Sequence, residues 1–193
     1  LMFRRSILLQ ALGWVGWVAL LAGVSLYLVD MRELYRRRRR KDLEANAAFG
    51  RVALWALGIS AALTGAAGAL GDFNALAPAL AYALLFGWLS GLALSQLYKI
   101  VPFLTWLERY GKSLGKVKVP RVQDLVVERR ARPIFWTYFA AALLGTLALL
   151  AGSAWLLRVA ALGTVIATLG IAREIWLVRH PKAEPLPGGQ KSA

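Results

Sequence analysis

The sequence predicts an all-α membrane protein, a polytopic bundle of five transmembrane helices, and three observations support this class. Four stretches, 6–29, 52–71, 73–98 and 133–157, contain no charged side chain. Each is long enough to cross the hydrocarbon layer, which takes about 20 apolar residues. Apolar residues make up 59% of the chain, above the roughly 45 to 50% of soluble domains. Lys and Arg also gather in alternate connections between these stretches.

The five spans are expected at about residues 6–29, 50–71, 76–98, 133–156 and 157–178. Gly71 to Asn74 has the composition of a turn, so the second and third spans are antiparallel neighbours. The last uncharged run, 159–172, crosses the bilayer only if Arg158, Arg173 and Glu174 lie at the interfaces and extend toward water. Residues 1–180 therefore form a single transmembrane domain, and the tail 181–193, which lacks apolar periodicity, is expected to be disordered.

Basic residues predict the orientation of the chain. They flank the first connection, fill the third and follow the last span, whereas the second and fourth connections contain only Arg158. Lys and Arg are retained on the cytoplasmic side during insertion, so the N-terminus should lie outside and the C-terminus in the cytoplasm. Arg4 and Arg5 favour the reverse, but the opposite end of the first span carries more positive charge. The expected location is the bacterial cytoplasmic (inner) membrane.

The arginine run after the first span predicts contact with lipid. A juxtamembrane basic cluster attracts anionic head groups by about 1 kcal/mol per residue. The net charge of +14 is also typical of nucleic-acid-binding proteins. Its position at span ends instead favours a topology signal, and we expect no nucleic-acid partner. The residues expected to contact lipid or the membrane interface are Arg36, Arg37, Arg38, Arg39, Arg40, Lys99, Trp106, Arg109 and Tyr110.

The third connection, 99–132, is expected to be a cytoplasmic amphipathic segment. Apolar residues recur near helical spacing from Ile100 to Leu114, with charged residues on the other faces. Pro102 should kink the chain where the span ends. We therefore expect 102–110 to form a helix that lies along the membrane interface between the third and fourth spans.

Small residues recur at every fourth position in three spans, a pattern that lets membrane helices approach closely. In the second span they are Gly58, Ala62 and Ala66. These faces either pack on one another or meet another chain. The positions are Ala79, Ala83, Gly87, Gly91 and Ser95 in the third span and Ala160, Thr164, Thr168 and Ala172 in the fifth.

Gln96 is the most notable polar residue near a span. We expect its amide to hydrogen-bond to a neighbouring helix, which in membranes contributes about 0.6 kcal/mol on average. The alternative is a contact with a quinone, a pigment or a lipid head group.

Catalytic chemistry finds little support in the sequence. Ionisable residues inside spans usually mark proton or ion pathways, and here the acidic residues fall at the span ends. Haem ligation generally needs His, Met, Cys or Tyr, but the single histidine, His180, follows the last span. We expect no catalytic residue, no metal site and no cofactor in this chain alone, so haem or quinone would have to be shared with a partner.

Two segments in the C-terminal part carry a family resemblance. QLYKIVPFLTWLERY (96–110), followed by KVPRVQDL (118–125), resembles poorly characterised bacterial membrane proteins similar to haem-copper oxidase subunit I and to NnrS-type haem-copper membrane proteins. The resemblance implies a cytoplasmic interfacial helix between two spans of a larger bundle. Haem-binding members have histidines in their spans, and this chain has none there. The resemblance therefore implies a partner subunit without haem ligands.

These observations favour a non-catalytic membrane subunit of a bacterial cytoplasmic-membrane complex, respiratory or otherwise redox-related, with anionic lipid and other membrane chains as partners. A small homo-oligomeric transporter or channel is the alternative, which deep polar residues would support. An enzyme acting on a lipid or quinone would need an acid–base pair. The only candidates, Glu108 and Arg109, are adjacent and so point to different helix faces.

Overall fold

The computed structural model describes residues 2–37, 44–71, 73–113 and 119–180, and the side chains of all of these except 2–10. Within these ranges the protein is helical and contains no strand. Five helical segments are long and apolar enough to cross a membrane. The predicted all-α class is thus confirmed for the described residues, and their five long apolar segments agree with the predicted number of spans. The expected disordered tail 181–193 and the interface residues Arg38, Arg39 and Arg40 lie outside them.

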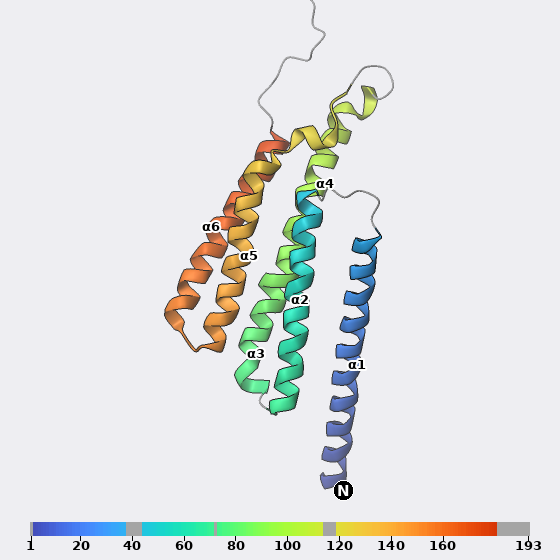
Figure 1. Cartoon of the computed structure of the whole chain (residues 1–193), viewed down its shortest axis with the longest axis vertical. Helices are drawn as coiled ribbons and strands as arrows, with labels where there is room; N and C mark the ends of the chain where they lie inside the picture. Colours follow the sequence, from blue (N-terminus) through green and yellow to red (C-terminus); the bar gives the residue numbers. More distant parts are fainter. Residues whose placement is uncertain (1, 38–43, 72, 114–118, 181–193) are drawn as a thin grey trace, which may run out of the picture.

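Four of the five spans described are single α-helices, α1, α2, α5 and α6 (Figure 1). Helix α1 at Met2–Arg36 stands at one edge, beside α2 at Ala45–Leu70. The third span is continuous and combines α3 at Phe73–Tyr82, the π-helical η1 at Ala83–Ser90 and α4 at Gly91–Tyr110. Two short 3₁₀ turns follow, η2 at Gly111–Ser113 and η3 at Val122–Leu125. Helices α5 at Glu128–Leu150 and α6 at Ala154–Arg179 form an antiparallel hairpin on the opposite side from α1.

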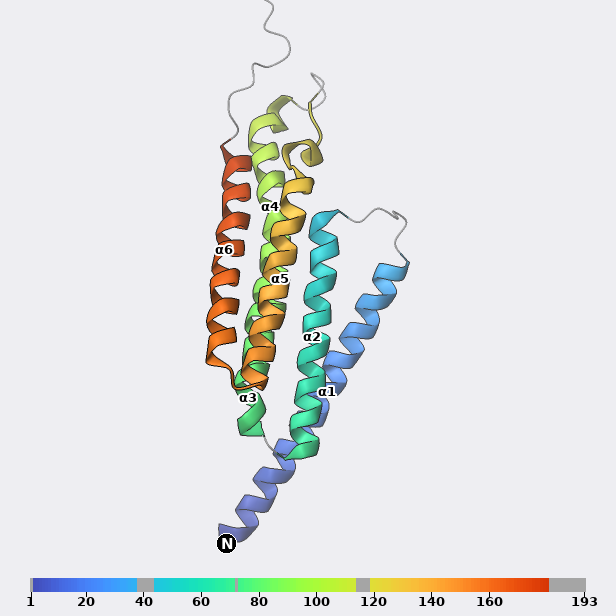
Figure 2. The same ribbon diagram turned by 60° about the vertical axis from the view of Figure 1, so that its left-hand side comes forward.

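The turned view separates the first span from the rest of the bundle. Helix α1 is inclined to α2 and diverges from it toward the end where α1 stops and α2 begins (Figure 2). We call this end, where α4 also ends and α5 begins, the basic end. The other elements pack side by side, and α5 and α6 share the most extensive contact.

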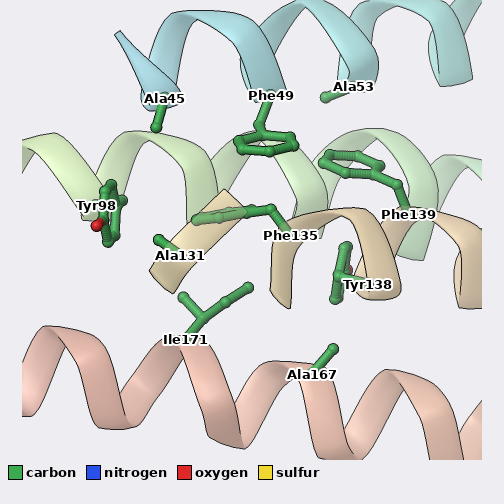
Figure 3. Packing of buried hydrophobic residues seen from close by; sticks show 10 residues of the cluster. All are labelled: Ala45, Phe49, Ala53, Tyr98, Ala131, Phe135, Tyr138, Phe139, Ala167 and Ile171. Carbon is green, nitrogen blue, oxygen red and sulfur yellow. The ribbon is translucent and has the colours of Figure 1, made fainter. Parts of the chain in front are cut away.

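The core lies between α2, α4, α5 and α6 and is built on aromatic rings (Figure 3). Phe135 is fully buried, and its ring stacks on Phe49 with centroids 4.6 Å apart. Tyr98 packs edge-on against the same ring at 5.6 Å. Such pairs contribute about 0.5 to 1.5 kcal/mol beyond their buried area. Ile171 of α6 closes the cluster from the far side.

The turn between the last two spans falls earlier than the sequence indicates. Helix α5 ends at Leu150 and α6 begins at Ala154, so the expected boundary between 156 and 157 lies inside α6. Gly152 adopts a φ of 65°, a conformation that glycine reaches without steric cost. The Ser153 side chain accepts a hydrogen bond from Leu156 N at 3.4 Å and so caps α6. Arg158 consequently lies in the second turn of α6.

The structure contains no separate helix at 102–110. Pro102 is buried inside α4, which runs on to Tyr110. A proline removes one hydrogen bond from a helix. The helix nevertheless continues through Pro102, which is buried in the bundle together with the nearby Thr105. Residues 99–110 are therefore the last three turns of the third span's helix. The sequence predicted a break in the helix at Pro102 because the local pattern carries no information on this packing.

Candidate functional site

The small-residue stripe of the third span lies inside the bundle. Ala79, Ala83, Gly87, Gly91 and Ser95 are all buried. A Cβ at Gly87 would lie 2.9 Å from the Ala56 Cβ of α2, and one at Gly91 would lie 2.6 Å from the Phe139 ring of α5. The stripe is thus the surface against which α2 and α5 approach the third span, and its partners belong to the same chain.

The π-helical segment keeps this stripe on one face. Four residues of an α-helix turn through about 400°, so a four-residue repeat drifts by about 40° at each step. From Ala79 to Ser95 the drift would reach about 160°. Hydrogen bonds from i to i+5 widen the turns of a π-helix, which lowers the rotation per residue. The segment Ala83–Ser90 therefore counteracts the drift.

The fifth-span stripe behaves differently because α6 has no such segment. Ala160 and Thr164 are buried, Thr168 is half-buried and Ala172 is exposed. Because a four-residue repeat rotates by about 40° at each step around an α-helix, its later members no longer lie on the buried face of α6. The buried face instead follows alternating steps of three and four residues, at Ala160, Thr164, Ala167, Ile171, Glu174 and Val178.

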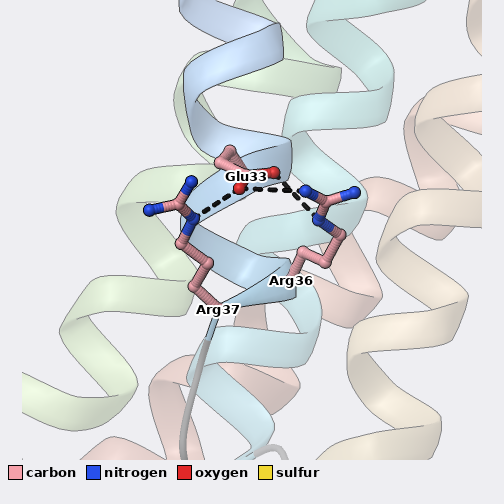
Figure 4. Close-up of polar contacts among 3 residues, drawn as sticks. All are labelled: Glu33, Arg36 and Arg37. Carbon is pink, nitrogen blue, oxygen red and sulfur yellow. Dashed lines mark hydrogen bonds and ion pairs between the residues drawn. The ribbon is translucent and has the colours of Figure 1, made fainter.

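Two arginines of the basic run are engaged within their own helix. Glu33 pairs with both Arg36, at 2.9 Å, and Arg37 (Figure 4). Both guanidinium groups are largely exposed, and exposed pairs contribute only about 0 to 1 kcal/mol. This arrangement orders the end of α1 weakly and leaves the arginines accessible to lipid.

The other residues expected at the interface lie around the basic end. Trp106 donates a hydrogen bond from Nε1 to the Pro120 carbonyl at 2.6 Å, and its ring lies 6.5 Å from that of Tyr110. Arg109 is exposed. Gln96 is exposed as well, and its amide nitrogen lies 3.7 Å from the position of a Cβ on Gly50. This places the Gln96 amide beside α2, the neighbouring helix.

Two glutamates at the basic end join elements that are distant in sequence. Glu44 accepts hydrogen bonds from Lys99 Nζ at 3.2 Å and from Gln123 Nε2 at 2.8 Å. Glu128 accepts one from the backbone N–H of Ala45 at 3.2 Å. That N–H belongs to the first turn of α2, where the helix itself offers no acceptor. The start of α5 therefore caps the start of α2.

A cavity of about 190 Å³ lies between these groups, and we propose it as the candidate functional site. We call it the polar cavity for the polar groups at its wall, although Pro102, Phe103, Val122 and Val126 also line it. Tyr98 lines it and is only 4% exposed, and its hydroxyl has no hydrogen-bond partner among the described residues. An unpaired buried polar group costs about 1 to 3 kcal/mol. A cavity of this size with polar groups on several sides suits ordered water or a small polar molecule. The other polar residues that line it are Glu44, Asn46, Lys99, Gln123 and Glu128.

Sequence reasoning missed this cavity and also the burial of Glu174. Glu44 and Glu128 lie in connections about 80 residues apart, and no local pattern indicates that they meet. Glu174 is 6% exposed, with Arg173 Nη1 at 3.5 Å. The steps of three and four residues that begin at Ala160 place Glu174 on the buried face of α6, so a helical pattern read at that spacing indicates its burial. Among the described residues, no group of three or more His, Cys, Asp or Glu could hold a metal ion.

Comparisons with protein-family models, with curated proteins and with solved structures find no match to this chain.

Proposed function

We propose that the protein is a non-catalytic integral membrane subunit that packs through α1 against helices of another chain. The proposed setting is a bacterial cytoplasmic-membrane complex, with the basic end in the cytoplasm as the positive-inside rule requires. The family resemblance makes a respiratory or other redox complex the leading candidate. Any haem or quinone would then be shared with the partner.

The exposure of α1 is the observation that carries this proposal. None of the most apolar stretch of α1 is buried, compared with 22 to 44% of the corresponding stretch in each other spanning helix. Large apolar side chains are exposed along it, including Leu12, Val15, Val18 and Leu26, and only the side toward α2, with Trp17 and Leu28, is half-buried. A helix that is apolar on every side belongs in lipid or against other helices.

Glycines on α1 indicate close approach by a partner helix. Gly13, Gly16 and Gly23 have no atom of another element within 4 Å of the position that a Cβ would take. In the third span, by contrast, Gly87 and Gly91 have such neighbours within 3 Å. Small residues permit close packing of membrane helices, and those of α1 are unmatched within the described chain.

The contacts of Glu108, one of the two residues considered as an acid–base pair, also agree with a structural role. Glu108 forms an ion pair with Arg179 at 2.5 Å, which ties the end of α4 to the end of α6. Both side chains are exposed, and no described cavity of notable size encloses them. Glu108 thus connects two helix ends rather than facing a site that could hold a substrate.

The test places a photo-crosslinking amino acid at Val15 in cells that express the full chain from its own locus. Leu162 of α6 is the matched control, because the two side chains are 66% and 62% exposed. We expect Val15 to crosslink to a second membrane protein and Leu162 to give no such product. Gly16→Leu should weaken the crosslink. Crosslinks from Val15 to lipid alone would contradict the proposal, and crosslinks to a second copy would instead favour the homo-oligomeric transporter or channel.

A further inference from the structure

A groove lies between the second half of α1 and the first half of α2. Its volume is about 590 Å³, which makes it larger than the polar cavity at the basic end. Its lining residues belong to the parts of α1 and α2 that diverge in Figure 2. The two segments touch at Tyr35, whose hydroxyl donates to the Ala47 carbonyl at 3.1 Å, and at Leu28 beside Gly58, and the groove lies along them.

Three arginines line one end of the groove. Arg32 and Arg36 come from α1 and Arg51 comes from α2. Arg36 pairs with Glu33, whereas Arg32 and Arg51 form no ion pair with any residue that the structure describes. Among the residues that the structure describes, no acidic side chain lines the groove. Arg32 of α1 and Arg51 of α2 therefore present positive charge to the same space that no described acidic group neutralises.

The remainder of the groove is apolar. Leu28 faces it from α1, and Leu54, Trp55 and Gly58 face it from α2. A Cβ on Gly58 would lie 3.7 Å from Leu28, so the glycine leaves room at this end. Seven residues separate Arg51 from Gly58, which is about 10 Å along the helix axis. That length is about two thirds of one leaflet of the hydrocarbon layer.

We propose that one anionic phospholipid binds in this groove. Its phosphate lies between the Arg32 and Arg51 guanidinium groups, and one acyl chain lies along Leu54, Trp55 and Gly58. Guanidinium groups bind phosphate by paired, charge-assisted hydrogen bonds. A free phosphate ion would neutralise the arginines but leave the apolar part of the groove unfilled. A zwitterionic lipid would place its own cation beside the arginines. An anionic lipid suits both parts and joins α1 to the bundle.

The test uses the full chain, purified in a neutral detergent and delipidated, with native mass spectrometry as the readout. Dipalmitoyl phosphatidylglycerol and dipalmitoyl phosphatidylcholine are titrated separately. We expect one phosphatidylglycerol per chain at concentrations where phosphatidylcholine does not bind. Arg32→Gln with Arg51→Gln should weaken phosphatidylglycerol binding about thirtyfold, which corresponds to about 1 kcal/mol per arginine. Arg129→Gln with Arg130→Gln, at exposed positions of the same end, should change it less than threefold.

A second variant separates the apolar contact from the charge. Gly58→Phe fills the groove and keeps both arginines, so it should weaken phosphatidylglycerol binding at least tenfold. Circular dichroism should show unchanged helix content in all variants, because the substituted side chains face the groove or water. Equal binding of the two lipids would overturn the proposal. So would full competition by millimolar inorganic phosphate, or undiminished binding to the arginine double variant.

Discussion

Replacing Gly91 by leucine tests whether the small-residue stripe of the third span is a packing surface. A Cβ at this position would lie 2.6 and 2.9 Å from two atoms of the Phe139 ring, and the rest of the side chain has no free space in the core. Overpacking of this kind costs about 1 to 3 kcal/mol, and at a fully buried site we take about 3. Leucine has higher helix propensity than glycine by about 1 kcal/mol. The expected net loss is thus about 2 kcal/mol.

The matched control is Gly65→Leu in α2. Gly65 is also a mid-helix glycine, but nothing lies within 4 Å of its Cβ position. The gain in helix propensity is common to both variants, so the difference between them isolates the steric cost at about 3 kcal/mol. Thermal unfolding in detergent, followed by tryptophan fluorescence and circular dichroism, gives the comparison. We expect Gly91→Leu to melt about 4 to 8 °C below wild type. Equal melting temperatures for the two variants would refute the packing argument.

Four further substitutions test other contacts of the fold. Tyr138→Phe should lower the free energy of unfolding by about 1 kcal/mol, because it removes the 2.8 Å hydrogen bond from the Tyr138 hydroxyl to the Phe86 carbonyl. Tyr98→Phe removes a hydroxyl that has no described partner, so it should lower the free energy of unfolding less in the same assay. Glu128→Ala should speed backbone hydrogen exchange in the first turn of α2, where it removes the cap, and unchanged exchange there would count against the capping role. Gly152→Ala should lower stability by about 1 kcal/mol in the unfolding assay, since its φ of 65° disfavours a side chain.

The class of the fold was readable from the sequence because lipid allows few solutions. A backbone in hydrocarbon must satisfy its own hydrogen bonds, so long uncharged segments in such a chain form helices. The third-span stripe was also found, since glycine and alanine at a regular spacing mark close approach. Ala172 shows the limit of that reasoning. A repeat of four residues follows one face only if something corrects its drift, and no local sequence signal marks the π-helical turns that do so.

The connections were harder to predict than the spans. Pro102 and Arg158 looked like boundary residues, and both lie within helices. Their positions depend on the neighbours they pack against, which no single segment encodes. The same holds for the candidate site. Glu44 and Glu128 meet only because α2 and α5 begin at the same end of the bundle.

The length of the third span has a consequence for the shape of the protein outside the lipid. The continuous helical segment from Phe73 to Ser113 has 41 residues, or about 60 Å at the rise of an α-helix. A bilayer with its head groups is about 40 to 45 Å thick. Phe73 lies at the turn after α2, so a bilayer aligned with that turn would leave an excess of about 15 Å at the basic end. There the last turns of α4 are held by neighbouring elements, because Trp106 donates to the Pro120 carbonyl and Glu108 pairs with Arg179.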